Sequence, residues 1–371
     1  MNYRVTLTNG TQSEILHSYR PSDPKISQAK ITEAVNEIPS FSFRILPDNP
    51  AYNAVEAGVS TVAVTDLDRG ATLFEGRCLS VSDGMSTAGV FAKTAVFEGE
   101  LGYLCDSVQP EGEVSQGTIN RSTLIDLITA HNEQSEHRFA LGNVEMAGFP
   151  EGSSYDWGVT FDVLRALFVD TLGGEIRLRK VGDTSCLDYA QEFAIEKDMP
   201  IYCGGNMREI TCAADVSGLI TRLYPLGAIR QSTGSRLTII PSGMAGGKSY
   251  IERADLVAKY GVRSGVAIYD VHGDGDTLVR GSTTLYRRGM NTLNAIAIGQ
   301  RQYKVSALDV SAGYELYGVH QVKNDIMGID ERLRIIGRTI DLDRPSNSTL
   351  TFGSKAATLS DAVAKYKGVM R

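Results

Sequence analysis

Gly76-Arg77-Cys78-Leu79-Ser80-Val81-Ser82 and Gly337-Arg338-Thr339-Ile340-Asp341-Leu342-Asp343 are two distant stretches of this chain that follow one pattern. Each opens with Gly-Arg and continues with alternating apolar and polar residues, the period of a β-strand that buries one face. Each is followed by a turn-rich gap, a second strand-like run, a leucine and an acid (Phe97-Glu98-Gly99, Leu104 and Asp106; Phe352-Gly353, Leu359 and Asp361). Unrelated antiparallel hairpins can share this pattern, but the repetition also predicts two related β-barrels. A trimer would then present six similar modules around its axis.

The rest of the sequence is typical of a β-rich α+β protein. Glycine (38 residues) far exceeds proline (11), and short alternating apolar runs recur between turn residues. Clean period-two runs predict strands at residues 41–45, 62–64 and 175–179.

Four helices are predicted against this β-rich background. Their boundaries come from N-cap residues, a capping box, glycines that end a helix and a proline that cannot continue one. The four are residues 26–38, ended by Pro39; a helix from Ser122 to before Asn132; a helix from Thr160, as N-cap, to Gly173-Gly174; and a helix from the capping box Ser249-x-x-Glu252 to Gly261.

Composition excludes several classes of protein. A length of 371 residues predicts two to four domains, and 42% hydrophobic with 22% charged residues is ordinary for a globular protein. The net charge of −7 and pI of about 5.4 have the wrong sign for direct nucleic-acid binding. No apolar run is long enough to span a membrane, and no secretory signal opens the chain, so synthesis in a host cytoplasm is expected.

The sequence contains no recognisable catalytic or metal-binding motif. H-E-x-x-H and G-x-S-x-G are absent, and the five histidines are far apart in sequence (His17, His131, His137, His272, His320). We interpret His131 and His137 as residues at a helix end, and Trp157 as a packing anchor. The five cysteines lack C-x-x-C spacing and are interpreted as buried small hydrophobes (Cys78, Cys105, Cys186, Cys203, Cys212). We therefore expect no catalytic residue, cofactor or metal.

Three polar segments invite functional interpretations. Asp270-x-His272-x-Asp274-x-Asp276 has alternating acids that could hold Ca²⁺, but it lacks the bidentate glutamate of an EF-hand, and an exposed acidic turn is the simpler interpretation. The glycine-rich runs 204–206 and 242–249 lack the complete P-loop pattern, so a loop that orders against a neighbouring subunit is favoured. The basic tail, residues 354–371, is predicted to be helical, with Lys365 and Lys367 at a threefold contact or at the rim of a tube exit.

An ordered set of short runs resembles the prophage tail endopeptidase or tail-associated lysin family, which is similar to the T4 baseplate hub protein. The match extends over nearly the whole chain, and it is the order of the runs that carries it. These runs are Asn36-Glu37-Ile38-Pro39-Ser40-Phe41-Ser42-Phe43, Glu98-Gly99-Glu100-Leu101-Gly102-Tyr103-Leu104-Cys105-Asp106-Ser107, His131-Asn132, Leu172-Gly173-Gly174-Glu175-Ile176-Arg177-Leu178-Arg179, and Thr221-Arg222-Leu223-Tyr224-Pro225-Leu226-Gly227-Ala228.

The resemblance implies a ring-forming hub with two similar β-barrels and two smaller mixed α/β domains. It places the first barrel at 1–103, an α/β domain at 104–200, the second barrel at 201–230 with 292–354, a small insertion at 231–291 and a helical tail at 355–371. It also implies a homotrimer at the virion tail tip that gates the lumen. The implied partners are distal tail, tail tube and tape measure proteins, and tip, spike or fibre proteins.

Two other functions remain open from the sequence. Some relatives carry enzymatic modules C-terminal to the hub, and because this chain ends at Arg371, we expect it not to be an enzyme. A peptidoglycan hydrolase would need a convergent catalytic pocket, for which the sequence shows no residue set. A host-receptor module that binds carbohydrate would normally expose more aromatics than one Trp suggests, although 16 Tyr residues leave that function open.

Overall fold

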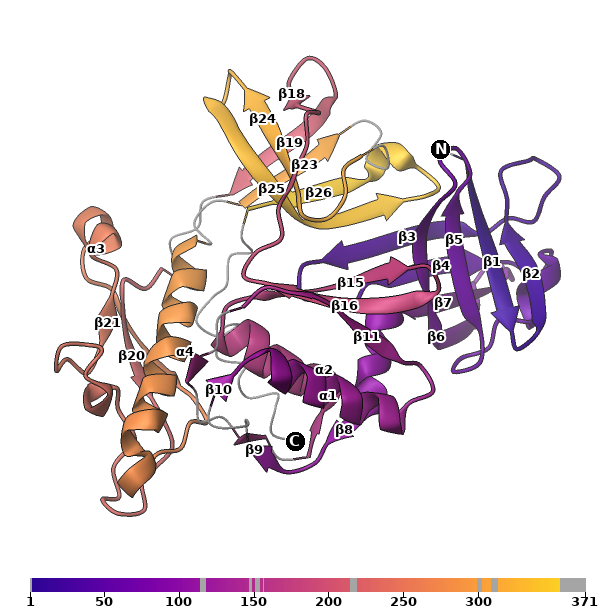
Figure 1. The fold of residues 1–371 in the computed structure, drawn as a ribbon. Coiled ribbons are helices and arrows are strands. Elements are labelled where there is room, and N and C mark those ends of the chain that lie inside the picture. Colours follow the sequence, from indigo (N-terminus) through magenta and orange to yellow (C-terminus); the bar gives the residue numbers. More distant parts are fainter. Residues whose placement is uncertain are drawn as a thin grey trace. The chain divides into compact units, whose positions relative to one another are not determined.

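The computed structural model describes residues 2–113, 118–146, 149–150, 154–155, 157–213, 219–298, 302–307 and 313–353. The chain divides into two compact units. Unit one comprises Met1–Gly102, Ala194–Thr211 and Tyr303–Phe352, and unit two comprises Tyr103–Phe193, Cys212–Gln302 and Gly353–Arg371. The fold is β-rich α+β, as the sequence predicts (Figure 1). The predicted helical tail, with Lys365 and Lys367, lies outside the described residues, as do Leu359 and Asp361.

Unit one is built on one large, curled and mainly antiparallel sheet. Along its path the strands are ordered β19-β23-β26-β25-β3-β4-β7-β6-β5-β1-β2, with β24 on β25 and with β17 and β18 parallel to β24. Its early strands are β1 (Tyr3–Asn9), β2 (Gln12–His17), β3 (Ser27–Ala34), β4 (Ser40–Ile45), β5 (Thr61–Asp66), β6 (Ala71–Met85) and β7 (Phe91–Gly99). The later ones are β17 (Ile195–Glu196), β18 (Ile201–Tyr202), β19 (Met207–Ala213), β23 (Gln302–Ala307), β24 (Gly318–Asn324), β25 (Ile329–Asp341) and β26 (Thr349–Phe352).

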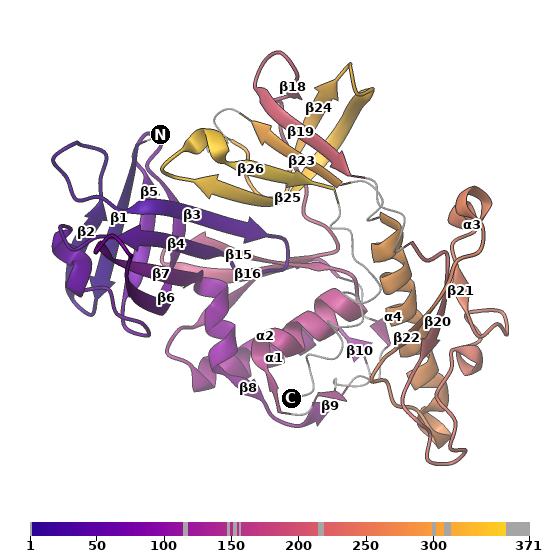
Figure 2. The same cartoon turned by 180° about the vertical axis from the view of Figure 1, so that it is seen from behind.

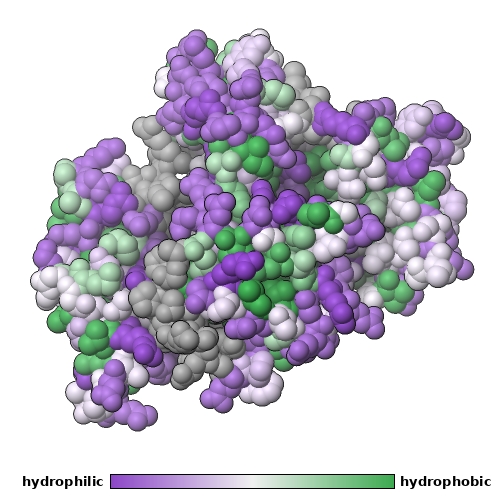
Figure 3. All heavy atoms as spheres, viewed as in Figure 1, coloured by the Kyte–Doolittle hydropathy of each residue, from purple (hydrophilic) through white to green (hydrophobic). Residues whose placement is uncertain are grey.

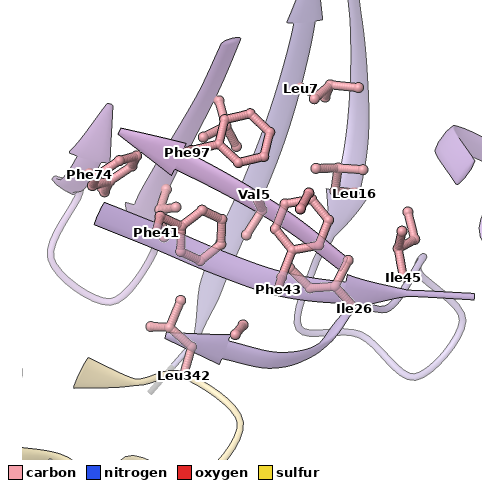
Figure 4. Packing of buried hydrophobic residues seen from close by; sticks show 14 of the residues in the cluster. Val5, Leu7, Leu16, Ile26, Phe41, Phe43, Ile45, Phe74, Phe97 and Leu342 are labelled. Atoms are coloured by element: carbon pink, nitrogen blue, oxygen red, sulfur yellow. The ribbon is translucent and has the colours of Figure 1, made fainter. Parts of the chain in front are cut away.

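The alternation in β4 produces the core of this sheet, as predicted. Phe41, Phe43 and Ile45 are at most 1% exposed, whereas the serine and the arginine between them are half-buried. In Figure 4 the rings of Phe41, Phe43 and Phe97 lie together, with centroids 5.5 to 6.3 Å apart. Such tilted and stacked aromatic contacts stabilise the core beyond the area that they bury. The strand predicted at residues 62–64 is also confirmed, as part of β5.

The helix predicted at residues 26–38 is wrong, because Ser27–Ala34 form strand β3 and a turn follows. Ala29 and Ile31 are fully buried at a spacing of two, and Ile31 lies opposite Phe41 of β4. β3 also pairs with β25, so the helical spacing of the other apolar residues was incidental. Asn36, with φ of 60°, turns the chain into β4.

The two Gly-Arg segments both lie in antiparallel hairpins, β6–β7 and β25–β26. Phe97 and Phe352, which follow them, are both fully buried. The registers differ, however: Gly76 lies opposite Gly99, two residues after Phe97, whereas Gly337 lies opposite Thr351, one residue before Phe352. The segments therefore share a hairpin form but not one register, and the count of two barrels stays a prediction.

A buried asparagine crosses the gap between β2 and the chain that enters β3. β2 pairs only with β1 in the described ladder. The Asn49 amide donates hydrogen bonds of 2.8 Å to the carbonyls of Leu16 and Lys25. Its oxygen accepts from the N–H of Ala51 and so caps the short helix Pro50–Asn53. Side-chain hydrogen bonds thus replace a strand ladder here.

A histidine stabilises the same gap. His17 Nδ1 accepts a hydrogen bond from the N–H of Ile26 at 3.4 Å, and its ring stacks on Tyr3 at 4.2 Å. Burial, assisted by the nearby Lys25, lowers the pKa of His17 to about 4. The ring is therefore neutral near pH 7, as its acceptor role requires.

The first part of unit two is a small α/β layer. Strands β11 (Phe139–Val144), β16 (Thr184–Ala190) and β15 (Glu175–Val181) form a sheet in that order. The helices are α1 (Arg121–Gln134) and α2 (Thr160–Leu164), which continues as a π-helix, η4 (Arg165–Thr171). Short two-stranded pairs complete it: β8 (Val108–Gln109) with β14 (Gly158–Val159), β9 (Gly112–Glu113) with β13 (Ser154–Tyr155), and β10 (Thr118–Ile119) with β12 (Phe149–Pro150).

The helices predicted in this layer are confirmed, with one correction at a cap. Asn120 caps α1 through a capping box. Thr160 is not an N-cap but the first helical residue, and no side chain caps α2. Gly173, with φ of 76°, follows the π-helix in the left-handed conformation expected of a helix end. The strand predicted at residues 175–179 is confirmed as β15.

The second part of unit two packs one long helix on a small sheet. Strands β21 (Ile251–Glu252), β20 (Arg222–Leu226) and β22 (Ser264–Ile268) are covered by α4 (Leu278–Ile298), with α3 (Ala254–Tyr260) between β21 and β22 in sequence (Figure 2). The short helices are η5 (Ile240–Ser242) and η6 (Gly275–Thr277). None of the described helices is long and apolar enough to cross a membrane.

Two sequence predictions fail in this part. The capping box is wrong: Glu252 belongs to β21, and Arg253 precedes α3 without a side-chain cap, although Gly261 does end the helix. The 21-residue α4 was not predicted, because glycine, serine and threonine interrupt its apolar pattern. These small residues allow close packing, since a Cβ at Gly281 would lie 2.3 Å from the carbonyl oxygen of His272.

Candidate functional sites

A serine and a histidine lie side by side inside unit two. The Ser107 hydroxyl is 2.6 Å from Nδ1 of His131, and Nε2 of His131 is 2.9 Å from the carbonyl of His137. Because a carbonyl only accepts, Nε2 carries the ring proton and Nδ1 accepts from Ser107. Thr160 Oγ1 lies 2.6 Å from Ser107 Oγ and accepts a hydrogen bond from Gln109. These groups form one continuous chain of hydrogen bonds.

This constellation has the geometry of a structural network. Ser107 is 2% exposed and His131 is fully buried, so a substrate has no access to the hydroxyl. Burial lowers the pKa of His131, which keeps the ring neutral. His137 stacks on Tyr103 at 3.9 Å just beyond α1. The network fixes the end of α1 against β8 and the first turn of α2, a role that sequence spacing could not reveal.

The other histidines do not gather into a site. His272 is exposed and contacts Asp270 at 3.0 Å. His320 is fully buried in β24, where Nδ1 donates to the carbonyl of Met199 at 2.9 Å. Burial lowers the pKa of His320, so it too is neutral near pH 7.

The acidic loop that could have held Ca²⁺ is occupied by internal hydrogen bonds. Asp274 accepts from the backbone N–H and the hydroxyl of Ser232, and Arg230 lies 3.3 Å away. The Ser232 bonds lower the pKa of Asp274 to about 2. Within the described part of the chain, no three His, Cys, Asp or Glu side chains are grouped to hold a metal.

The Gly-Lys-Ser sequence does not form a phosphate-binding loop. Gly247, Lys248 and Ser249 lead into strand β21, whereas a P-loop must lead directly into a helix whose N-terminus faces the phosphate. Lys248 instead contacts Glu252 at 3.8 Å. The geometry gives no support for nucleotide binding.

The structure corrects the sequence interpretation of Trp157 and of most of the cysteines. Trp157 is 67% exposed with a φ of 46°, so it is not a packing anchor. Cys78 and Cys186 are buried as predicted, and burial raises the pKa of Cys78 to about 11. The interpretation is wrong for the remaining three, since Cys105 and Cys203 are exposed and Cys212 is intermediate.

A buried carboxylate in the α/β layer serves the fold. Asp188 is fully buried and contacts Arg177 and Arg179 at 2.8 and 2.9 Å. Burial would raise the pKa of Asp188, but hydrogen bonds from Arg179, Arg177 and the N–H of Asn143 outweigh it and lower the pKa to about 2. This ion-pair cluster joins β15 to β16 and lacks the partly protonated carboxyl that general acid catalysis needs.

Unit one contains an open polar pocket of about 650 Å³ where β3 meets the end of β25. Two cations and two acids line it, and Asp341 lies 4.0 Å from Lys30 and accepts a hydrogen bond from the N–H of Arg344. A small-molecule site usually has a largely apolar lining, which this pocket lacks. Its lining residues are Ser27, Gln28, Lys30, Ser42, Asp341, Asp343, Arg344 and Asn347.

The hairpin of β6 and β7 exposes apolar side chains at its tip. Met85 and Phe91 lie opposite each other and are 62% and 56% exposed, and Val90 between them is 45% exposed. Phe91 shares a strand face with the buried Ala95, so the inward face of the hairpin continues beyond the core. Leu79, 58% exposed, marks a register shift at the base of this extension. A protruding apolar hairpin is a candidate contact surface.

The large sheet of unit one ends at β19 on one side of the described path, with no further strand beyond it there. On the other side, Asn49 and His17 bridge β2 to the chain that enters β3. Free strand edges carry unpaired backbone groups and are places where another chain can add.

Comparison with known proteins shows that this fold is similar to that of tail proteins. The sequence model of the prophage endopeptidase tail family matches residues 196–363, which confirms the resemblance noted above. No curated protein sequence matches the chain significantly.

Three solved structures illustrate the likeness. Prophage tail protein gp18 of Listeria monocytogenes matches with a TM-score of 0.57 and 13% identity, over 99% of each chain. The 43 kDa tail protein of prophage MuSo2 from Shewanella oneidensis gives 0.63 and 12%, over 97% of this chain and 99% of that one. The E. coli c3393 protein, a type VI secretion component described as similar to the T4 tail proteins gp27 and gp5, gives 0.53 and 10%, over 95% and 77%. At these identities the likeness establishes the fold.

Proposed function

We propose that this protein is a structural component of a phage or phage-like tail tip, assembled as a homotrimeric hub. The hub would join the tail tube and distal tail ring to the tip, spike or fibre proteins, contact the tape measure protein and gate the lumen. The observation that carries the proposal is the fold: tail proteins match it over nearly the full length of both chains. The family match over residues 196–363 adds support from the sequence.

The two Gly-Arg hairpins support a ring of six similar modules. Each ring-forming barrel would contain one of them, in residues 1–103 and in residues 201–230 with 292–354. A trimer could then mate a threefold body with a sixfold tube. The α/β domain at 104–200, the insertion at 231–291 and the tail at 355–371 complete this proposed division.

Uncovered surface in unit one is consistent with assembly. The apolar hairpin tip would be costly to leave in water, and the free edge of β19 in the described path would be open to wrong partners. A stable ring interface typically buries about 2,000 Å² or more, enough to cover such features.

Two features of the described residues argue against an enzymatic function. The one serine–histidine pair is sealed inside unit two, and the acidic loop is internally bonded. The alternatives to a hub are a peptidoglycan hydrolase and a receptor module that binds carbohydrate. Turnover of purified cell-wall fragments, or saturable binding to them by the isolated chain, would favour one of these alternatives over the hub.

Imaging of the purified protein tests the hub proposal. Electron microscopy should show threefold rings with a central opening. Replacing Met85 and Phe91 by aspartate should reduce the rings to smaller species, because a charge would be buried in the contact. Thr87→Asp, at an exposed position of the same hairpin turn, is the matched control and should leave the rings intact. Single particles without threefold symmetry at every concentration would reject the proposal.

A further inference from the structure

Within the described residues, α4 covers one face of the small sheet of unit two and leaves the other exposed. Leu223, Ile251 and Ala267 pack with α4 and are at most 4% exposed. The strand register places Tyr224 beside Val266 and Leu226 beside Ile268 on the opposite face. Val266 and Ile268 are 53% and 43% exposed. We call this exposed side of β20, β21 and β22 the open sheet face.

Aromatic and charged side chains on the open sheet face hold one another in place. Arg222 makes two hydrogen bonds, of 2.7 and 3.0 Å, to Glu252, and its guanidinium lies 4.2 Å from the ring centroid of Tyr250. Tyr224 packs on Tyr250 at 5.5 Å, and Lys248 lies 5.3 Å from the same ring. Protein-binding patches are typically rich in ordered tyrosine and arginine side chains, and here these lie beside exposed aliphatic residues.

Charge is distributed unevenly along the chain. Residues 219–298, which carry the open sheet face, contain ten Arg and Lys but five Asp and Glu, a net charge of +5. Since the whole chain carries −7, the remainder carries −12. Most of that excess lies in residues 103–193, with fifteen acidic and six basic residues, a net charge of −9. A second copy of this chain therefore offers the complementary charge.

The outer face of α1 is the part of that acidic layer suited to meet the open sheet face. Leu124, Leu127 and Ile128 face inward and are buried. Asp126 and Glu133 are exposed on the outer face, and Ile125 beside them is 39% exposed. The exposed side of α1 thus carries two acids and one apolar residue, with Arg121 at its first turn, whereas the open sheet face is apolar and aromatic with Arg222 and Lys248 beside Glu252. In Figure 3 the surface at the left, where Figure 1 shows β20 and β21, mixes hydrophobic and hydrophilic residues.

We propose that the open sheet face of one copy docks on the acidic outer face of α1 of the next copy. Because two different surfaces meet, the contact is heterologous, the kind that generates rings when its rotation closes. This inference rests on the proposed trimer and specifies which surfaces join its subunits. It predicts a trimer that weakens as salt rises, since exposed charges are screened within about 10 Å at 0.1 M salt.

Charge reversal tests the contact. Lys248→Glu and Glu133→Lys should each weaken the trimer, by roughly two- to tenfold per interface and thus roughly tenfold to a thousandfold for a ring of three. The double variant should recover the loss, because opposite charges again face each other. Arg280→Glu, on α4 behind the sheet, is the control: its charge change is the same, its position is exposed, and the trimer should be unchanged. Sedimentation velocity over a concentration series measures the trimer population of the wild type and of the four variants.

Two aspartate substitutions at exposed valines give a second measurement. Val266→Asp should weaken the trimer, whereas Val279→Asp, on α4 and 57% exposed, should not. A wild-type chain that is monomeric at every concentration would overturn the trimer and this contact with it. A wild-type trimer that Lys248→Glu and Val266→Asp leave unchanged would overturn the contact alone. Unchanged circular dichroism spectra would show that the variants fold.

Discussion

The gap between β2 and β3 offers a sharp test of how unit one is held together. Asn49→Ala removes three hydrogen bonds at once: two donated to the carbonyls of Leu16 and Lys25, and one accepted from the N–H of Ala51. Asn49 is 3% exposed, so little water replaces them. No backbone ladder spans this gap in the described sheet, and the loss should therefore be felt by β2 first.

The expected cost follows from the burial of each group. Leu16 is fully buried, and a buried polar group left without a partner costs about 2 kcal/mol. Loss of the cap on the short helix Pro50–Asn53 adds about 1 kcal/mol. Lys25 is exposed, so water can reach its carbonyl and little is added there. The total is about 3 kcal/mol, roughly a hundredfold in the opening equilibrium of this region.

Hydrogen exchange followed by mass spectrometry is the suitable assay. Peptides that cover residues 12–26 should exchange roughly a hundredfold faster in Asn49→Ala, while peptides from β15 and β16 of unit two should be unchanged. Asn53→Ala is the matched control, because Asn53 is exposed at the end of the same short helix and should have little effect. Equal protection of β2 in both variants would refute the role assigned to Asn49.

Three further predictions follow from particular contacts. Gly76→Ala should destabilise unit one by about 2 kcal/mol or more in urea unfolding, because the new Cβ would lie 2.0 Å from a backbone oxygen of β7. Gly337→Ala should cost far less, because the nearest atom to its Cβ would be 3.4 Å away. Equal losses of stability in the two variants would contradict this packing. His17 has a folded pKa of about 4, below its unfolded value, so its contribution is complete above about pH 6.5 and is lost as pH falls toward 4. The opening equilibrium at Ile26, taken from exchange rates corrected for the intrinsic pH dependence of amide exchange, should therefore rise with acid in the wild type and follow pH less in His17→Gln. Parallel corrected profiles would exclude His17 as the titrating group. Trp157, 67% exposed, should fluoresce like an indole in water and change little on unfolding, and a blue-shifted native spectrum would place it in the core instead.

Local alternation and helix-end signals allowed much of this fold to be predicted. Phe41, Phe43 and Ile45 repeat at a spacing of two, and the structure places all three in the core. Gly173 and Gly261 mark the predicted helix ends because each has a positive φ that a side chain disfavours. These features depend on neighbouring residues alone, and this is why sequence sufficed.

Predictions failed where distant parts of the chain decide the structure. Ser27–Ala34, within the predicted helix 26–38, form a strand because β4 and β25 flank them, and that pairing is invisible in a short window. α4 is a helix although Gly281 and Gly289 weaken its pattern, since those glycines allow close approach to Pro225 and the chain at His272. Tertiary packing outweighs local propensity in both cases.

The candidate surfaces were less visible in the sequence than the fold. The exposure of Met85 and Phe91 depends on how far their hairpin extends beyond the core. The excess of positive charge in residues 219–298 could have been counted from the sequence, but the net charge of −7 conceals it. The Ser107–His131 pair joins residues that are 24 positions apart, and no spacing rule predicts it.

The solution mass of the purified chain, measured by light scattering over a range of concentrations, tests the central claim most directly. The hub account predicts a species of three times 40.1 kDa that gains population with concentration and loses it with salt. A mass of 40.1 kDa at every concentration and salt would contradict the self-assembling trimer.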